Sequence, residues 1–569
     1  MSAPRRPPLA DLRRTAHAWR EARRAFPRCP ENAVARAPHG ARVGIVGAGL
    51  SGLVAGLELL DRGFTVDVFE RSTRIGGRLM SWWDGALGPR PVPIERATHG
   101  VWWTYNNLRE LLGRHGIPLR SGWVNRDHGG VPIAFPDGRT RHLTVGRGLP
   151  SLLHGLPFWR AAQRELVDPG ERLGLRQLLA LMAFDNSAEA IARYDARTAE
   201  AWAEDVGLPR SIVKGLVDPL LDMCNFQGAS TSSALAWHRF ASTHFADWRD
   251  LRVTQFFDGP AGESVLAPLR DRLLARGGRI HLGAEVQALR VRDQRVTGVA
   301  LAARRGPSLC PACHLPGVSP CRGCGYAGDD FRHPDHPGGE VALDAVIVAV
   351  ALPAARALLS RAPWSDDPFF ARVARLPTAN PTIVYTSHPG SAARAAWRRA
   401  HGTQEVLFTA GYPTIGTVID TSLLHGRVMP PEVEIIEADL PRGERFDGLS
   451  DDDVVARVLT DLARLVPGLP APVARRVLRW RDFTTSEVGS EALRPPVVTP
   501  VAGLCLVGDW VAVPQNCYYM ERCVVSARLA VNALVERFGH RGDALTILPS
   551  ETPSLALEMV RRLSRLVVG

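Results

Sequence analysis

The chain has 569 residues, of which 45% are hydrophobic and 22% are charged, a balance typical of a folded globular protein. At this length we expect two or three domains. No apolar run reaches the roughly 18 residues of a membrane-spanning helix, and the arginine-rich N-terminus lacks the apolar core of a signal peptide, so we expect a cytosolic protein.

Much of the net charge of +11 lies in residues 1–28, which hold eight arginines against Asp11 and Glu21. Apolar residues recur there at helical spacing, as they do among the arginines of SLALEMVRRLSRLVVG, residues 554–569. Both segments predict basic amphipathic helices that either pack on the protein or hold it peripherally at a membrane. No recognition module accompanies the charge, so we expect no nucleic-acid partner.

A glycine-rich stretch, GAGLSG at residues 47–52, lies between a strand-like apolar run and a helix-like one. In a βαβ unit Gly47 permits a tight turn, Gly49 lets the backbone approach a pyrophosphate, and Gly52 lets the helix pack on the sheet. Glu70 ends the next strand-like run, where a carboxylate accepts hydrogen bonds from ribose hydroxyls. These residues predict a dinucleotide without a 2′-phosphate, and both NAD and FAD fit.

Four of the nine cysteines lie in CPACHLPGVSPCRGC, residues 310–324. Two CxxC pairs bring four thiolates within reach of one tetrahedral ion, as in closed structural zinc sites. The predicted zinc ligands are Cys310, Cys313, Cys321 and Cys324. Reduced thiols, a redox pair and an iron centre are the alternatives, and His333 and His336 are interpreted as exposed loop histidines.

The run VFERSTRIGGR, which contains Glu70, resembles the FAD-binding N-terminus of the flavin amine oxidase and carotenoid desaturase superfamily. The late segment GLCLVGDW…YYMERCVVSARLA resembles the closing motif of that superfamily, and IERATHGVWWTYNNLRELLGRHGI is similar to its zeta-carotene desaturase and isorenieratene synthase branch. The resemblance spans about residues 42–540. It implies FAD as the cofactor and an α/β fold, with a Rossmann-like FAD-binding domain interleaved with a mixed α+β substrate domain and a helical module.

The resemblance also implies which residues contact FAD. Gly76, Gly77 and Arg78 are placed along the pyrophosphate and the near side of the flavin, and Val286 at the adenine end. Asp509 is suited to accept hydrogen bonds from ribityl hydroxyls, and the helix that begins near Met520 directs its positive end at the flavin. The full predicted set is Gly47, Gly49, Gly52, Glu70, Arg71, Gly76, Gly77, Arg78, Val286, Gly508, Asp509 and Met520.

The order of motifs divides the chain into consecutive segments. A basic extension (1–41) precedes the first FAD-binding segment (42–145), a helical substrate module (146–255) and the second FAD-binding segment (256–370), which contains the cysteine insertion (306–339). A substrate domain (371–490), the closing FAD-binding motif (491–540) and an amphipathic tail (541–569) follow.

The function implied by the resemblance is desaturation of a long apolar isoprenoid or polyene such as a carotenoid, with hydride transfer to flavin N5. Such chemistry needs an apolar tunnel and one modest base. His99 is the candidate base, and a structural hydrogen-bonding histidine is its alternative interpretation. The sequence leaves the substrate, the electron acceptor and the oligomeric state open.

Two other functions compete with desaturation. Amine oxidases of this fold commonly hold a lysine near flavin N5, but the only lysine here, Lys214, lies too early in the chain. A non-catalytic scaffold that uses the cysteine segment as an interaction surface is disfavoured, because GAGLSG, Glu70, GGR and GDW are all intact.

Overall fold

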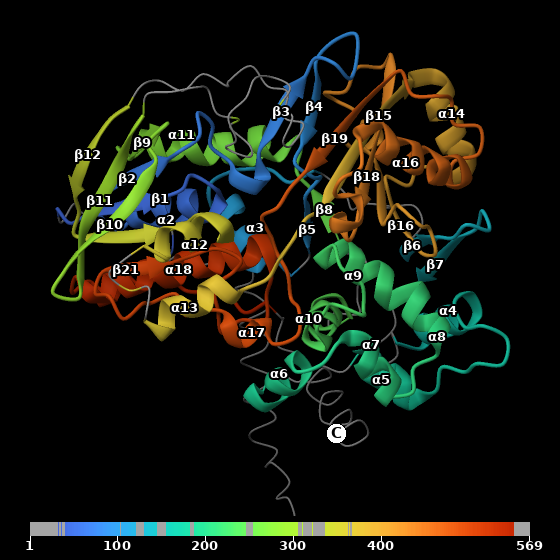
Figure 1. Cartoon of the computed structure of the whole chain (residues 1–569), viewed down its shortest axis with the longest axis horizontal. Coiled ribbons are helices and arrows are strands. Elements are labelled where there is room, and N and C mark those ends of the chain that lie inside the picture. Colours follow the sequence, from blue (N-terminus) through green and yellow to red (C-terminus); the bar gives the residue numbers. More distant parts are fainter. Residues whose placement is uncertain are drawn as a thin grey trace, which may run out of the picture.

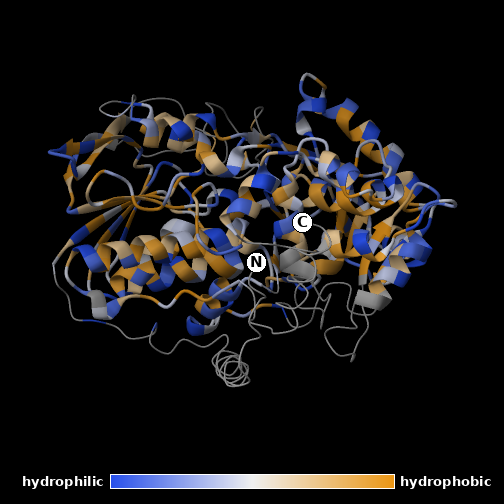
Figure 2. Ribbon diagram, turned by 90° about the horizontal axis from the view of Figure 1, so that it is seen from below, coloured by the Kyte–Doolittle hydropathy of each residue, from blue (hydrophilic) through white to orange (hydrophobic). Residues whose placement is uncertain are grey.

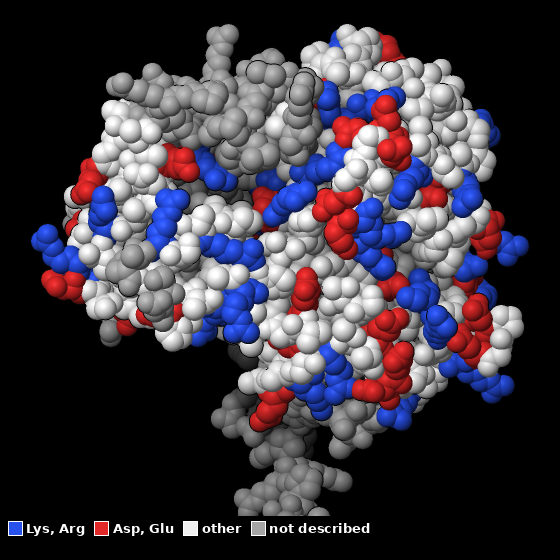
Figure 3. All heavy atoms as spheres, in the orientation of Figure 1, with Lys and Arg blue, Asp and Glu red and all other residues white. Residues whose placement is uncertain are grey.

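The computed structural model describes residues 32, 36, 40–102, 104–120, 130–144, 155–182, 187–245, 254–304, 310, 321, 336–361, 364 and 367–550. Two bodies lie side by side, and a group of helices lies below the second of them (Figure 1). Hydrophobic residues follow the strands of both bodies (Figure 2). On the face drawn in Figure 3, basic and acidic side chains are interspersed rather than gathered by sign.

The first body is built on a parallel sheet of five strands, whose neighbours are all parallel. In spatial order they are β21 (Leu504–Leu506), β13 (Ala345–Val348), β1 (Arg42–Val46), β2 (Thr65–Glu70) and β9 (Arg279–Leu282). The central strands are continuous apolar runs because helices cover both faces of such a sheet.

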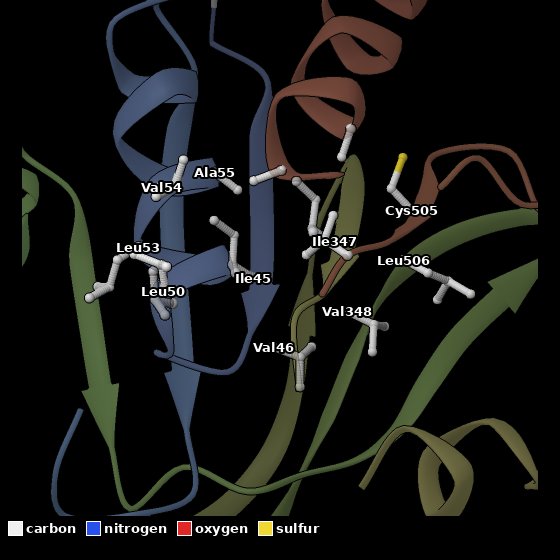
Figure 4. Packing of buried hydrophobic residues seen from close by; sticks show 14 of the residues in the cluster. Ile45, Val46, Leu50, Leu53, Val54, Ala55, Ile347, Val348, Cys505 and Leu506 are labelled. Carbon is white, nitrogen blue, oxygen red and sulfur yellow. The ribbon is translucent and has the colours of Figure 1, made fainter. Parts of the chain in front are cut away.

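Helices pack on this sheet and bury its side chains. They are α2 (Leu50–Leu60), α11 (Ala267–Ala275), α12 (Leu352–Leu359), α13 (Pro368–Arg375) and α18 (Tyr519–Arg537). Ten of the eleven residues of α2 are buried, as expected for a helix that is apolar on nearly every side. Figure 4 shows side chains of α2 beside those of β1, with side chains of β13 and β21 further along the same core.

An antiparallel sheet of three strands is attached to the first body: β10 (Val286–Arg292), β11 (Arg295–Arg304) and β12 (His336–Ala342). The cysteine segment connects β11 to β12. The run GEVALDAVIVAVAL, which the sequence indicates as one buried strand, is instead divided between β12 and β13 in two different sheets. The break falls at Asp344, whose carboxylate accepts a hydrogen bond from the backbone N–H of Arg42 at 2.8 Å.

The second body is built on a mixed sheet of seven strands, in which only the β16–β6 pair is parallel. In spatial order they are β19 (Ala474–Arg479), β15 (Thr382–Pro389), β18 (Val433–Leu440), β17 (Thr417–Asp420), β16 (Val406–Thr409), β6 (Gly130–Ala134) and β7 (Thr140–Thr144). One face packs on α14 (Gly390–His401) and α16 (Asp451–Leu465). The other face packs partly on Met80, Trp82, Val92 and Ile94, and its remainder borders the cavity described below.

The helical module consists of α4 (Gly155–Glu165), α5 (Leu175–Met182), α6 (Ala188–Asp195), α7 (Ala199–Asp205), α8 (Arg210–Ile212), α9 (Asp218–Asn225) and α10 (Ala234–Phe245). Ser187 and Thr198 cap α6 and α7 by accepting backbone N–H bonds three residues on. A π-helical turn, Val213–Val217, joins α8 to α9.

Several short elements complete the fold. They are β3 (Ser81–Asp84) with β4 (Val92–Glu95), β5 (Gly100–Trp102) with β8 (Thr254–Phe256), β14 (Thr378–Ala379) with β20 (Phe483–Thr484), α3 (Asn106–Arg114), α15 (Thr421–Leu424) and α17 (Ser490–Leu493). Single turns of 3₁₀ or π helix occur at Gly77–Leu79, Gly262–Leu266, Gly443–Phe446 and Arg541–Asp543.

A buried ionic network ties α2, α3 and α18 together. The guanidinium of Arg528 contacts Glu58 at 3.2 Å and also pairs with Glu110, and all three side chains are at most 2% exposed. Arg114 pairs with Glu58 at 2.5 Å and with Glu110 at 3.0 Å. Because each buried charge has an opposite partner, the network holds three helices in one arrangement.

Replacement of Arg528 by methionine is expected to lower the free energy of unfolding by about 3–5 kcal/mol, because buried Glu58 and Glu110 lose a shared partner. Arg475→Met, which breaks an exposed pair with Asp452, is expected to cost less than about 1 kcal/mol. Urea unfolding followed by tryptophan fluorescence compares the two variants. Equal losses would contradict a stabilising role for the network.

The loss of stability caused by Arg528→Met is also expected to depend on pH. Burial raises the pKa of Glu58, but the charges of Arg528, Arg114 and Arg62 outweigh burial and leave this pKa lowered. A carboxyl of this kind stabilises the folded state above its unfolded pKa, and the contribution disappears as pH falls. The stability difference between the wild type and Arg528→Met should therefore narrow in acid.

Candidate functional site

Two glycines of the GAGLSG loop are required by the protein's own structure. Gly47 has φ +107°, and a Cβ there would lie 2.6 Å from the carbonyl oxygen of Ala349. A Cβ at Gly52 would lie 2.0 Å from the carbonyl oxygen of Gly47. Any side chain at either position would displace backbone, so these residues fix the turn from β1 into α2.

Gly49 differs, because neither its backbone nor its protein neighbours require glycine. Its conformation is extended, with φ −80°, and a Cβ would meet nothing closer than the carbonyl oxygen of Gly76 at 3.9 Å. A side chain would instead enter the space between this loop and Gly77. The first turn of α2 directs backbone N–H groups at the same space, so it fits a pyrophosphate that approaches the backbone closely.

Glu70 lies at the end of β2, as predicted. Its carboxylate accepts hydrogen bonds from the backbone N–H groups of Ala48 and Ser72, each at 2.8 Å. Burial raises the pKa of Glu70, and these two hydrogen bonds oppose that effect. The segment that leads to Val286 is hydrogen-bonded to the end of β2, since the backbone N–H of Ala284 donates to the carbonyl oxygen of Glu70 at 2.9 Å.

The glycine doublet lies against the GAGLSG loop. The backbone N–H of Gly76 donates to the carbonyl of Ala48 at 3.0 Å, and Gly76 forms a parallel bridge with Gly49. Positive φ values at Gly76 and Gly77, +131° and +56°, allow the chain to turn into the helical turn that carries Arg78.

Arg78 and Asp509 bring the two FAD motifs into contact through an ion pair of 2.5 Å. Asp509 follows β21 and Gly508, whose N–H donates to the hydroxyl of Ser526 at 3.0 Å. Arg71 is partly buried beside Glu70, and Met520 is buried in the first turn of α18. The structure thus brings the glycine doublet against the GAGLSG loop and Arg78 against Asp509, and the assignment of these residues to FAD stays a prediction.

Glu521 does not face this surface. Its carboxylate accepts hydrogen bonds from the backbone N–H groups of Asn107 and Leu108 at 2.8 and 3.0 Å. It therefore caps the first turn of α3, where backbone N–H groups lack helical partners. Its role is structural.

A largely apolar cavity of about 200 Å³ adjoins the N-terminus of α18. Its walls come from the segment after β4, the helical module, the free face of the seven-stranded sheet and α18. The lining residues are Ala97, Thr98, His99, Gly100, Trp102, Tyr105, Val131, Pro132, Leu143, Phe158, Leu216, Leu220, Met223, Cys224, Phe226, Phe240, Phe256, Val406, Phe408, Thr417, Ile419, Asp439, Phe483, Tyr519 and Met520.

His99, the predicted base, lies in the wall of this cavity. Its side chain is 25% exposed, and its Nδ1 lies 3.5 Å from a carboxylate oxygen of Glu95. These two atoms make no hydrogen bond to each other, and the catalytic assignment of His99 stays a prediction.

The sequence interpretation missed the acidic residues of the wall. Glu437 and Asp439 lie two residues apart on β18, so they share the face that the cavity adjoins. The available signal was the strand sequence VEIIEADL, in which Glu437 and Asp439 fall on the same face as Val433 and Ile435. Tyr105, whose hydroxyl is buried, was also missed.

Lys214 does not line the cavity. Its ammonium pairs with Asp218 at 2.8 Å and with Glu200 at 3.6 Å, and its side chain is 51% exposed. Its place on the helical module is consistent with the argument against amine oxidase chemistry.

The zinc prediction falls only partly within the described residues. Cys310 and Cys321 are both buried and belong to one hydrophobic cluster with Trp82 of β3. Cys313, Cys324 and His333 lie outside the described residues, as does the side chain of His336. Within the portion of the chain that the structure covers, no group of three or more metal-ligating side chains occurs. The four-cysteine site stays a prediction.

Known proteins are similar to this chain over most of its length. A family model described as flavin containing amine oxidoreductase matches residues 50–535. The chain belongs to this family. A carotenoid phi-ring synthase from Streptomyces griseus is 28% identical over 92% of this chain and 93% of its own length. A zeta-carotene desaturase from Synechocystis is 23% identical over 87% and 97%.

Solved structures share the fold. A putrescine oxidase with bound putrescine aligns with a TM-score of 0.57 at 16% identity, covering 87% of this chain and 99% of its own. An oxidoreductase from Methanosarcina mazei aligns with a TM-score of 0.55 at 15% identity, covering 86% and 100%. The predicted α/β fold is confirmed, and membership of the family makes the chain an FAD-dependent oxidoreductase.

The membrane predictions concern segments outside the described residues, 1–30 and 551–569. Among the helices that the structure describes, none combines the length and apolar character needed to cross a bilayer.

The site predicts distinct effects of substitution at Glu70 and Gly49. Glu70→Ala removes the ribose acceptor, and Gly49→Val fills the pyrophosphate space, so both variants are expected to be purified without FAD. Gly85→Val is the matched control, because a Cβ at Gly85 meets nothing within 4 Å. Flavin absorbance per chain measures the result, and full occupancy in the Gly49 and Glu70 variants would contradict the site.

Proposed function

We propose that this protein desaturates a long apolar isoprenoid or polyene such as a carotenoid. The observation that carries the proposal is the aromatic and aliphatic cavity that adjoins the FAD-contacting residues through the first turn of α18. The relatives named as carotenoid phi-ring synthase and zeta-carotene desaturase support the same substrate class.

The cavity walls supply binding and exclusion of water. Apolar substrate surface buried against side chains such as Phe158, Phe240 and Phe408 contributes about 25 cal/mol per Å². A polyene carries no group that requires a hydrogen bond, so the sparse polar lining suits it.

FAD, when bound, accepts the hydride that leaves an allylic carbon. The residues of this chain that face the cavity hold that carbon in place and must take up the proton lost from the neighbouring carbon. His99 is the base that the sequence proposes for this transfer.

Anaerobic mixing of the FAD-loaded protein with carotenoids and shorter isoprenoids in detergent micelles tests the proposal. Polyenes are expected to bleach the flavin, and a polyamine such as putrescine is not. Phe408→Glu, which puts a charge into the apolar wall, is expected to slow bleaching at least about tenfold. Leu175→Glu is the control, because Leu175 is 70% exposed. Bleaching by amines and not by polyenes would overturn the proposal.

We also propose that the cysteine segment holds one structural zinc. Support comes from the spacing of the four cysteines and from the burial of Cys310 and Cys321 in a common cluster beside β3. An ion held there would fold a connection between two adjacent strands that has little other apolar content to bury.

Elemental analysis under reducing conditions should find one zinc per chain. Cys310→Ser with Cys324→Ser is expected to lose the metal and retain FAD, because the segment is an insertion in the sequence between β11 and β12, outside the FAD motifs. Cys505→Ser, in β21, is expected to keep the zinc. A wild-type protein without metal would exclude the site.

Peripheral membrane contact through residues 1–30 and 551–569 is the remaining proposal, since an apolar substrate resides in the bilayer. Flotation with anionic liposomes is expected at low salt and is expected to weaken at high salt. Deletion of either segment should reduce the fraction of protein that floats with the liposomes. Protein that stays at the bottom at low salt, with and without these segments, would show the proposal to be wrong.

A further inference from the structure

The strand β18 presents different chemistry on its two faces. Ile436, Ala438 and Leu440 pack in the cluster formed with α14 and α16. Glu437 and Asp439 point to the opposite side, where Asp439 lines the cavity beside Thr417 of the neighbouring strand. Two acids therefore interrupt an otherwise apolar face at the position where the sheet adjoins the substrate space.

Asp439 is the carboxyl group that this cavity exposes to a substrate. Its side chain is partly buried, and its Oδ1 is enclosed without a hydrogen-bond partner among the described residues. None of the described residues that line the cavity is a lysine or an arginine, so no cation there holds Asp439 in its charged form.

Glu437 lies behind Asp439 and is fixed in position. It is fully buried, and its carboxylate accepts hydrogen bonds from the backbone N–H and the hydroxyl of Thr98 at 2.8 and 2.5 Å. Burial raises the pKa of Glu437, and burial together with the neighbouring Glu437 raises the pKa of Asp439 well above the ordinary aspartate value. Two such carboxyls resist being ionised together.

Other titratable groups surround this pair. Tyr385 stands opposite Glu437 on β15, and Glu95, at the end of β4, is close enough to Glu437 to raise its pKa. His99 lies in the segment after β4, and His425, which is buried, faces Glu95. Tyr105 and Tyr519 line the cavity from the side of α18.

We propose that Asp439 accepts the proton that the substrate loses during desaturation, and that Glu437 is its positioning residue. This inference rests on the proposed function. The hydride, with its two electrons, leaves an allylic carbon for FAD. The C–H bond on the neighbouring carbon then breaks, its electron pair becomes the new C=C bond, and its proton goes to the Asp439 carboxylate.

Charge balance favours Asp439 over His99 for this step. Removal of a hydride leaves a positive charge on the polyene, and an apolar cavity makes any charge costly. Proton transfer to a carboxylate cancels two opposite charges, whereas transfer to an imidazole only moves the positive charge onto the protein. A carboxylate with raised proton affinity is also the stronger base.

Single-turnover product formation by the FAD-loaded protein tests the assignment. Asp439→Asn is expected to slow product formation by about 10²-fold or more, with substrate affinity unchanged. His99→Gln is expected to have a smaller effect. Glu432→Gln is the control, because this exposed glutamate immediately precedes β18 and contacts only Arg90 at the surface. FAD content and melting temperature verify that each variant is folded.

The pH dependence of the rate of product formation distinguishes a catalytic role of Asp439 from a structural one, because a structural role would leave it unchanged. The rate should rise with pH through a value above that of an ordinary aspartate, because only the ionised Asp439 accepts a proton. Glu437→Gln removes the neighbouring acid and is expected to shift this rise to lower pH. The inference is overturned if Glu437→Gln leaves the pH profile unchanged, or if Asp439→Asn forms product as fast as the wild type. In either case, flavin bleaching by polyenes would still support the proposed function. If no polyene bleaches the flavin, both the proposed function and the assignment of Asp439 are wrong.

Discussion

The buried ion pairs among Glu58, Glu110, Arg114 and Arg528 are the constraint on which the cofactor site depends. Glu58 and Arg528 are 470 residues apart in the chain, and each lies on a helix that begins at an FAD motif. Charges removed from water are stable only with partners at close range, so α2, α3 and α18 have one permitted arrangement. Glu521 adds to this constraint, because it caps α3 from the first turn of α18.

This arrangement places one end of α18 beside both the predicted FAD contacts and the cavity. The network fixes the body of the helix, and the ion pair between Arg78 and Asp509 fixes the loop that precedes it. Met520, which is one of the predicted FAD contacts, lies in the first turn of α18 and lines the cavity. Hydride transfer requires reacting atoms to be held within contact distance, and a shared rigid wall provides that.

Local patterns in the sequence were enough to predict the features of the site that local geometry determines. The turn at Gly47, the acid at the end of β2 and the start of α18 follow from strand and helix periodicity with glycine at fixed positions. Contacts between distant segments were not predictable in this way. No periodicity indicates that Arg78 meets Asp509, and the division of one apolar run between β12 and β13 was marked only by Asp344, which binds the backbone of β1.

Glu437 and Asp439 interrupt an otherwise apolar strand face, and such an interruption indicates a function that the apolar pattern alone does not reveal. A buried carboxyl such as Glu437 destabilises a sheet relative to an apolar residue of similar size, so packing gives no reason for it. On the opposite face of the same strand the buried acid Glu434 is paired with Arg394 of α14 at 2.7 Å, and Ile436, Ala438 and Leu440 pack with α14 and α16. Asp439, in contrast, borders a cavity whose described lining residues include no lysine or arginine, and burial beside Glu437 raises its pKa, which suits it to take up a proton.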